Sequence, residues 1–457
     1  MSIQIDHSLT AVALRPAIER LFQASAPKIL DIEKNWKPEQ GAPVFTVDGK
    51  YTARGWTEWT QGFQFGSALL QYDVTGDPEF LEIGRRNTIQ RMASHVSHFG
   101  VHDHGFNNVS TYGNLWRLMR EGQIDWNERE NDIYELALKI SGAVQAARWT
   151  EINGGGGYIY SFNGPHSLFI DTMRSLRSLA VAHQLGHILM GECDQRFSLL
   201  DRLVAHGKAT ARYAVYFGEG RDSYDVRGRT AHESIFNTND GRYRCPGTQQ
   251  GYSPFSTWSR GLAWAILGFA EELEFFATRP EIQEGNNGSV EAREIFEKAA
   301  QATADFYLRE ACACGVPMWD FGAPNLQNLG DYKDLPADPF NSWEPVDSSA
   351  AAIAAQGLIR LGNYLQKRSQ PDVGYRAAGF TIAKTLFQEP YLSESAGHQG
   401  LILHSVYHRP NGWDQIHEGQ VVPNGESSMW GDYHARELAL LIWRESQSEQ
   451  YYFFKHD

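Results

Sequence analysis

The sequence has little cysteine and no long apolar run, and both absences narrow the kinds of protein it can encode. Four cysteines are spread over 457 residues without a paired CxxC spacing, so a zinc ribbon is not indicated. We expect Cys193, Cys245, Cys312 and Cys314 to be free, buried thiols, with disulfides left open. No stretch approaches the roughly 20 apolar residues of a membrane span, and the N-terminus lacks the apolar segment of a cleavable signal. The expected location is the cytoplasm, or the periplasm if a leader was removed.

The chain is also poor in basic charge. Its 41 Lys and Arg residues stand against 55 Asp and Glu residues, which gives a formal net charge of −14 and a pI near 5.6. Because no basic stripe runs along the sequence, nucleic acid and anionic membranes are disfavoured as partners. An acidic sugar would have to be bound by local donors, since the long-range field would repel it.

Linkers rich in Pro, Gly or Ser are absent as well, so we expect residues 1–457 to form a single domain. Helical periodicity recurs throughout, whereas continuous alternating strands do not. Asp347 and Asp432 are expected as N-caps of late helices. The pattern predicts about a dozen helices, near 9–25, 60–74, 78–98, 108–121, 126–148, 167–186, 190–217, 258–277, 290–311, 347–367, 371–387 and 432–446.

Helices of this number, joined as hairpins by loops of mixed length, fit an all-α toroid in which an outer ring of helices surrounds an inner ring. The longer connections carry aromatic and polar residues and should form the mouth of the toroid. They are residues 100–108, 218–257, 315–345 and 393–429. The last of them has period-two alternation at 401–408, which predicts a short strand pair.

Aromatic side chains, by contrast, are abundant: they make up 12% of the chain and include 13 tryptophans. Sugar rings stack on such surfaces, although many of these side chains will simply be packing. Trp56 and Trp59 stand just before the expected start of a helix near residue 60. A sugar-stacking platform and ordinary helix-end packing are equally compatible with that position.

Two carboxylates in unlike settings carry the strongest indication of chemistry. Asp103 lies between His102 and His104 in an expected loop, whereas Asp171 interrupts the apolar face of a predicted helix. Desolvation by an apolar wall pushes a carboxyl group toward its protonated form, and neighbouring donors keep one ionised. We therefore expect Asp171 to be held protonated as a general acid and Asp103 to remain an anion, a pairing suited to sugar chemistry.

Each of these candidates has a structural alternative. His102, Asp103 and His104 could hold a metal ion, although three consecutive side chains rarely converge on one ion, and Asp103 alone could brace a loop. Asp171 could be an exposed acid that interacts with a helix dipole. Arg260 could grip a substrate carboxylate in a bidentate fork, or it could form an ion pair that ties its loop to a helix.

Taken in order, the motifs resemble the unsaturated glucuronyl hydrolases of glycoside hydrolase family 88, with the unsaturated rhamnogalacturonyl hydrolases as near cousins. Singly each motif is weak, but the series spans most of the chain. It comprises residues 59–63 with Gly66 and 72–77, His102-Asp103 with Gly105-Phe106, 170–173, 250–252 with 258–261, 347–351 and 430–433. The resemblance implies a six-hairpin (α/α)6 barrel.

The resemblance also implies a reaction. It gives Asp171 the acid and base work and makes Asp103 the second essential carboxylate. Substrates of the family are oligosaccharides left by polysaccharide lyases, with a C4=C5 double bond in a non-reducing terminal uronic acid, and hydration of that bond expels the aglycone. No metal and no cofactor are required. Substrate contacts are expected from Trp59, His102, His104, Gln250, Trp258, Arg260, Trp264 and Trp430.

Three departures from the family pattern put the substrate in doubt. Leu262 stands where a glutamine is usual, Gln249 replaces a histidine, and His104 replaces a more apolar residue. A saturated uronide is therefore an alternative substrate. A polysaccharide lyase on the same barrel, with Tyr252, His404 or His408 as base, is an alternative enzyme. A carbohydrate-binding protein without catalysis would keep the tryptophans without needing Asp171.

Overall fold

Helices dominate the computed structural model, which describes residues 2–55, 58–279 and 287–454. They are α1 (Arg15–Asn35), α2 (Gln61–Thr75), α3 (Pro78–Arg91), α4 (Ala93–Val96), α5 (His104–Asn107), α6 (Asn114–Arg120), α7 (Glu128–Ala147), α8 (Thr172–Ser175), α9 (Arg177–Gln184), α10 (Leu199–Tyr213), α11 (Ser259–Ala277), α13 (Asn287–Glu310), α14 (Ser348–Lys367), α15 (Tyr375–Leu386) and α16 (Met429–Ser446). A π-helical turn at Val109–Gly113 precedes α6.

Short strands decorate the helices. They are β1 (Phe45–Val47), β2 (Lys50–Thr52), β3 (Trp149–Glu151), β4 (Gly157–Ile159), β5 (Ser167–Phe169), β6 (Leu189–Met190), β7 (Arg196–Phe197), β8 (Glu233–Asn237) and β9 (Arg242–Gly247). β5, β8 and β9 form a three-stranded sheet, and the others pair as hairpins. All of these pairings are antiparallel.

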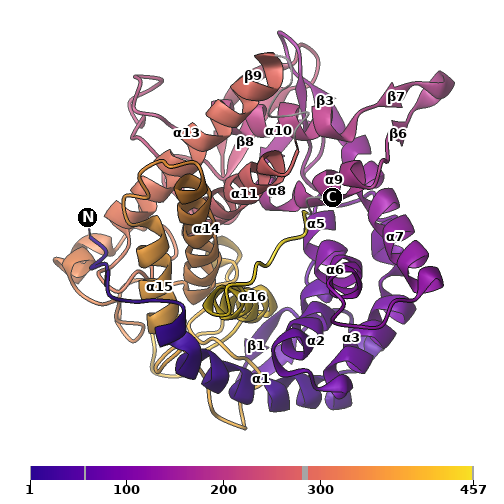
Figure 1. The fold of residues 1–457 in the computed structure, drawn as a ribbon. Coiled ribbons are helices and arrows are strands. Elements are labelled where there is room, and N and C mark those ends of the chain that lie inside the picture. Colours follow the sequence, from indigo (N-terminus) through magenta and orange to yellow (C-terminus); the bar gives the residue numbers. More distant parts are fainter. Residues whose placement is uncertain (1, 56–57, 280–286, 455–457) are drawn as a thin grey trace.

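The helices form two concentric rings (Figure 1). In the outer ring lie α1, α3, α7, α10, α13 and α15, and each is followed in sequence by an inner segment. Contacts close the inner ring through α2, the π-helical turn with α5, then α8, α11, α14 and α16, which returns to α2. This arrangement confirms the predicted all-α (α/α)6 barrel.

Small residues allow the inner helices to approach one another closely. A Cβ atom on Gly357 of α14 would lie 2.7 Å from the backbone nitrogen of Leu267 in α11. One on Gly268 of α11 would lie 2.5 Å from the carbonyl carbon of Met173 in α8. Asp347 starts α14 as predicted, since its side chain accepts hydrogen bonds from two backbone N–H groups of the first turn.

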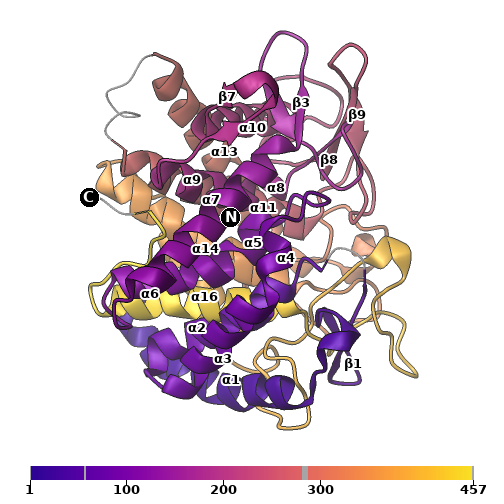
Figure 2. The same ribbon diagram turned by 90° about the vertical axis from the view of Figure 1, so that its right-hand side faces the viewer.

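The ends of the barrel differ (Figure 2). The β1–β2 hairpin and the long loop between α15 and α16 lie at one end, and the C-terminal tail lies at the other. The tail crosses the ring (Figure 1), where the hydroxyl of Tyr451 lies 3.0 Å from Oε1 of Glu437 and Phe453 packs over Arg177. A polar network thus closes the barrel at the tail end and leaves the loop end for a pocket.

Most helix predictions are confirmed within a few residues, and the misses have identifiable causes. α1 begins at Arg15 and continues through Pro27 to Asn35, because Ile29 and Ile32 beyond the proline are buried. The helix predicted from 167 is wrong at its start, where β5 pairs with distant β8; a short apolar run fits a buried strand as well as a helix.

Three further predictions need correction. The helix predicted over 190–217 begins only at Leu199, and the segment before it belongs to the β6–β7 hairpin. The strand pair at 401–408 is absent from the described residues. In that segment the structure has an isolated bridge between Leu392 and Ile402. α16 begins three residues before Asp432, and its N-cap is Ser428, whose side chain accepts a hydrogen bond from the N–H of Gly431.

The described cysteines are free, as predicted, but only Cys312 is buried and Cys314 is half-buried. Cys193 and Cys245 are exposed, because one follows the β6 strand and the other lies on the edge strand β9. Within residues 2–55, 58–279 and 287–454, no helix is both long enough and apolar enough to cross a bilayer.

Candidate active site

A cavity opens at the loop end of the barrel. It brings together eight of the ten residues predicted for the site: Trp59, His102, Asp103, Asp171, Gln250, Trp258, Arg260 and Trp264. The rest of its lining is Phe106, Phe162, Gln249, Tyr407, His408, Asn411 and Trp413. Trp56, the other half of the proposed stacking platform, lies outside the described residues.

Asp103 is buried at the start of α5, with 6% of its surface exposed. Its side chain makes no capping hydrogen bond to the helix, so it does not act as the loop brace considered above. The carboxyl group instead lines the cavity.

Asp171 occupies a different position from the one predicted. It lies between β5 and α8, as the N-cap residue of a single helical turn, rather than on the face of a long helix. The strand pairing fixes it, because the N–H of the preceding Ile170 donates to the carbonyl of His232, 3.0 Å away. Only 8% of Asp171 is exposed, which rules out the alternative of a solvent-exposed acid.

One nitrogen of His102 faces both carboxylates. Its Nε2 lies 3.8 Å from Oδ1 of Asp103 and 3.6 Å from Oδ1 of Asp171. The ring is buried beside Phe162 and Phe169, and among the described residues neither ring nitrogen has a hydrogen-bond partner. The three groups are therefore close enough to share a proton after a small movement, and nothing else in the described chain competes for it.

The electrostatics of the carboxylates are the reverse of our expectation. Burial raises the pKa of Asp171, but the facing His102 and the nearby His232 outweigh it and hold the pKa of Asp171 below its ordinary value. Burial dominates at Asp103, where the negative charge of Asp171 adds to it, and the pKa of Asp103 is raised. Burial lowers the pKa of His102, yet the two carboxylates raise it overall. The nearby imidazole, rather than the apolar wall, decides which carboxyl ionises first.

Arg260 lines the cavity, but its guanidinium is already engaged. Nη1 donates to Asp347 at 3.2 Å and to the carbonyl of Val406, and Nη2 donates to Gln250 at 2.9 Å and to the carbonyl of Tyr407 at 2.8 Å. The group is also held between the rings of Trp258 and Trp430. These contacts correspond to the structural alternative, an ion pair that ties loops to α14. The bidentate grip on a substrate carboxylate is not supported.

Two predicted substrate contacts do not reach the cavity. His104 points away from it, with Nδ1 2.9 Å from the hydroxyl of Ser141 and Nε2 2.9 Å from the carbonyl of His98. Since His102 lines the cavity and His104 points away from it, the two side chains cannot bind the same ion. Trp430 is fully buried and stacks beneath Trp59 with ring centroids 4.9 Å apart, so it supports the cavity wall without lining it.

The aromatic wall is built from rings of distant segments. Trp59 precedes α2, and Phe106 of α5 packs on Trp264 of α11 with centroids 4.8 Å apart. Trp258 comes directly before α11. These rings give the cavity flat apolar faces of the kind on which sugar rings stack.

Sequence reasoning missed residues that matter to the cavity. His232 supports it from behind: its Nδ1 accepts from the N–H groups of Gln249 and Gln250 at 3.0 and 3.3 Å. Asn411 and Trp413 lie in an irregular loop with no periodic pattern. No local signal points to them, although their loop was among those expected at the mouth.

No protein-family model matches the chain. A relative named unsaturated glucuronyl hydrolase, from Bacillus sp. (strain GL1), is 27% identical over 405 residues, which are 86% of this chain and 89% of the relative. One named unsaturated chondroitin disaccharide hydrolase, from Streptococcus agalactiae serotype III (strain NEM316), is 24% identical over 96% of this chain and 93% of the relative. The crystal structure of the Bacillus sp. GL1 unsaturated glucuronyl hydrolase superposes with a TM-score of 0.69 and 22% identity, covering 96% of this chain and 99% of that one.

Over most of its length the chain is similar to proteins named unsaturated glucuronyl hydrolase and unsaturated chondroitin disaccharide hydrolase. Its divergence from the family pattern can now be placed in the structure. Leu262 is fully buried and does not line the cavity, so the expectation that it replaces a sugar contact is wrong. Gln249 does line the cavity. Of these two departures from the pattern, the one that reaches the cavity is Gln249 and not Leu262.

Proposed function

We propose that the protein is a glycoside hydrolase that removes a non-reducing terminal unsaturated uronic acid from oligosaccharides left by polysaccharide lyases. Two likenesses support this substrate class: the Bacillus relative is named for an unsaturated glucuronyl group and the S. agalactiae relative for an unsaturated chondroitin disaccharide. The single observation that carries the proposal is the pair of buried carboxylates in one aromatic cavity, joined by His102.

The proposed reaction is hydration of an enol ether. Protonated His102 passes its proton to the carboxylate of Asp171 once an anionic substrate has displaced water and raised the pKa of that carboxylate. Asp171 then protonates C4, and positive charge develops on C5 and the ring oxygen. The regenerated carboxylate takes a proton from water, and the hydroxide adds to C5. The hemiketal opens, the aglycone leaves as an alcohol, and the proton on Asp171 returns to His102.

Asp103 has a different task in this scheme. It faces the same imidazole nitrogen as Asp171, so its charge helps to keep His102 protonated until the substrate arrives. The same negative charge on Asp103 also stabilises the developing cation. The usual spacing rule for retaining and inverting glycosidases does not govern this reaction, because no glycosyl-enzyme bond forms.

Substrate recognition relies on neutral groups. Among the residues that line the cavity, the single Lys or Arg side chain is Arg260, and its Nη1 and Nη2 groups already donate to protein acceptors. The uronate carboxylate is therefore assigned to neutral donors on the rim, of which Gln249, His408 and Asn411 have suitable side chains. This arrangement avoids placing a fixed positive charge next to the C5 centre where the transition state is itself positive.

The test is a panel of lyase-generated disaccharides, followed by loss of the ultraviolet absorbance of the C4=C5 bond. A hydrolase removes this absorbance, whereas a lyase on the same barrel would create it. Asp171→Asn should abolish the loss, and Asp125→Asn, which alters an exposed carboxylate, serves as the matched control. A rise in absorbance with intact polysaccharide, or no change with any disaccharide, would refute the proposal.

The lyase alternative has weak support from the residues considered as its base. Tyr252 is half exposed and lies outside the cavity lining. His404 is buried outside the lining as well, and its Nδ1 accepts from the N–H of Gly425. His408 does line the cavity, but its Nδ1 accepts from the N–H of Asn411 at 3.3 Å.

A further inference from the structure

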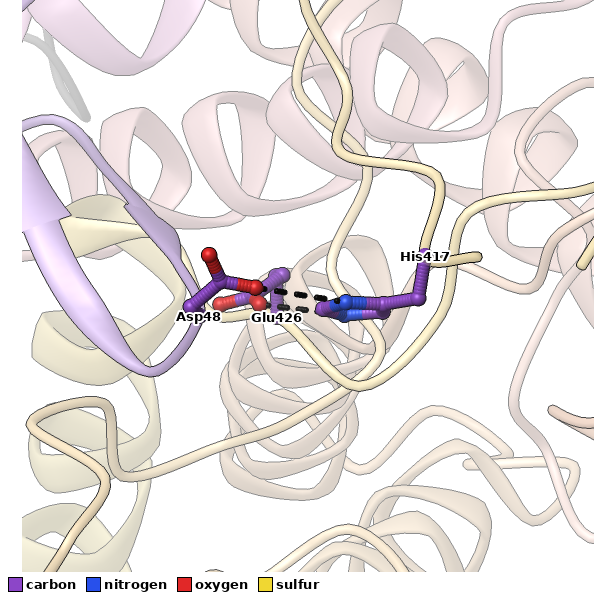
Figure 3. A group of neighbouring side chains, drawn as sticks. All are labelled: Asp48, His417 and Glu426. Atoms are coloured by element: carbon purple, nitrogen blue, oxygen red, sulfur yellow. Dashed lines mark ion pairs between the residues drawn. The ribbon is translucent and has the colours of Figure 1, made fainter. Parts of the chain in front are cut away.

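A second histidine lies between two carboxylates, at the rim of the barrel and outside the cavity lining (Figure 3). Nδ1 of His417 lies 3.5 Å from Oδ1 of Asp48, and its Nε2 lies 3.2 Å from Oε1 of Glu426. One ligand atom from each residue falls within 4.8 Å of the others. In the described part of the chain, no other group of at least three His, Cys, Asp or Glu residues meets this condition.

We propose that Asp48, His417 and Glu426 bind a divalent transition-metal ion of the Zn²⁺ class. Imidazole nitrogen and carboxylate oxygen are ligands that such ions accept, at about 2.0–2.2 Å, and a nitrogen ligand disfavours Ca²⁺ and Mg²⁺. Two carboxylates and a neutral imidazole supply two negative charges, which match the charge of the ion. Three protein ligands leave room for water to complete the coordination shell.

Glu426 is held as metal-ligating carboxylates usually are. It is buried, and its Oε2 accepts hydrogen bonds from the hydroxyl of Thr46 and, at 3.3 Å, from the N–H of Gly49. Its Oε1 faces His417. Oε2 thus anchors the side chain, and Oε1 is left to bind the proposed ion.

The other two residues can complete the site. Asp48 is 77% exposed at the tip of the β1–β2 turn, so its carboxylate is free to move toward an ion held by the other two ligands. His417 can turn its Nε2 to the ion while Nδ1 keeps its proton. His398 is not a ligand, because its Nδ1 accepts from the N–H of Gly400 at 3.0 Å and its Nε2 faces the carbonyl of Gly425 at 3.1 Å.

The ion would fasten two segments that are far apart in sequence. Asp48 belongs to the β1–β2 turn, and His417 lies in the loop that supplies His408, Asn411 and Trp413 to the cavity. Trp413 packs on Tyr407 and His408, so the position of the loop shapes this part of the cavity. Metal binding should therefore affect stability and KM more than the chemical step.

The test titrates the EDTA-treated, dialysed full chain with ZnCl₂ by calorimetry and follows its thermal unfolding. The wild type should bind one ion per chain, with a higher Tm in Zn²⁺ and a weaker response to Ca²⁺. His417→Ala should weaken binding at least tenfold, and Asp48→Asn should weaken it less. Glu418→Gln removes an exposed charge from the same loop and should bind as the wild type does.

Two results would overturn the metal proposal. One is wild-type protein that binds no Zn²⁺, or His417→Ala that binds it equally well. The other is a wild-type Tm that does not change with Zn²⁺ but falls as pH rises, while the Tm of His417→Ala does not fall. That result would identify a protonated imidazole as the link between the two carboxylates. Calorimetry separates the proposal from the enzymatic one, because binding is measured without turnover.

Discussion

The protein contains two histidines that each lie between two carboxylates, and they are built differently. In the cavity, a single nitrogen of His102 faces both Asp103 and Asp171, and the ring is 1% exposed. At the rim, the two nitrogens of His417 face Asp48 and Glu426 separately, and the side chain is 32% exposed. Similar residues thus meet in two geometries and two degrees of burial.

The difference teaches how geometry selects chemistry. A single nitrogen between two acids holds one proton that either acid can receive, and burial makes that choice sensitive to a substrate charge. Two nitrogens facing opposite ways cannot share one proton between acids, but they can join two segments. The cavity cluster is therefore suited to proton transfer and the rim cluster to fastening.

The largest effect should come from Asp171→Asn. If this group carries the proton to C4, an amide cannot replace it, and kcat should fall about 10³-fold, within the usual range for positioned proton transfer. The measurement is loss of the C4=C5 absorbance at saturating disaccharide, with Asp125→Asn as control. Retention of most turnover with an unchanged Tm would remove Asp171 from the mechanism.

His102→Gln should come next, with kcat lowered by roughly 10- to 100-fold. The imidazolium lowers the pKa of both carboxyl groups, so its loss should raise them. In this variant a carboxyl group must supply the proton. Because that carboxyl group loses its proton at lower pH than the histidine does, the alkaline limb of the plot of kcat against pH should move to lower pH. A fall in kcat without any movement of that limb would indicate a merely structural ring.

Lowering the pH should destabilise the protein through its buried histidines. Burial, the main cause at each, lowers the pKa to about 4 or about 3 in the folded protein for His95, His104, His206, His232, His404, His408 and His434. Their ordinary value is 6.5, so between pH 6.5 and 4 the unfolded chain binds more protons, and stability falls as pH falls.

Buried acids oppose this trend. Burial raises the pKa of Glu274 to about 7, that of Asp320 to about 6 and that of Glu272 well above its ordinary value, so their contributions to stability improve as pH falls below the raised pKa of each group. The histidines outnumber them, and the free energy of unfolding should drop by several kcal/mol, an order-of-magnitude figure, from pH 7.5 to 5.5. Urea unfolding at the two pH values measures it, and equal stability would show that the rings are not held neutral.

The smallest catalytic effect should follow His417→Ala. Since the rim cluster lies outside the cavity lining, kcat should stay within about twofold of wild type, and any change should appear in KM through the 409–425 loop. Steady-state kinetics with and without ZnCl₂ check this. A loss of kcat as large as that of His102→Gln would erase the distinction between the two clusters.

Local sequence signals carried the fold a long way and the cavity part of the way. The helices α2, α7, α11 and α14 follow the predicted ranges closely, because amphipathic periodicity and caps such as Asp347 are local properties. β5 was mistaken for helix because its partner β8 lies more than 60 residues further on. The same error misplaced Asp171, which the sheet positions next to His102.

Side-chain direction was the harder part to predict. His102 and His104 stand on either side of Asp103 in the sequence, yet one faces the cavity and the other bonds to Ser141 and His98. Arg260 is predicted as a candidate clamp, but its Nη1 and Nη2 groups donate to side chains and to the carbonyls of residues 406 and 407. Such partners come from loops without periodicity, so no local pattern announces them.

The sequence by itself determined the barrel, the family likeness and the residue types that gather in the cavity, since these follow from periodicity, caps and ordered motifs. Only the tertiary structure decided which carboxyl holds its proton more tightly. That property depends on the distance from each oxygen to one buried imidazole nitrogen, and the electrostatic energy between buried groups varies steeply with distance and burial. Segments far apart along the chain set those distances, and for the same reason the rim cluster became visible only in three dimensions.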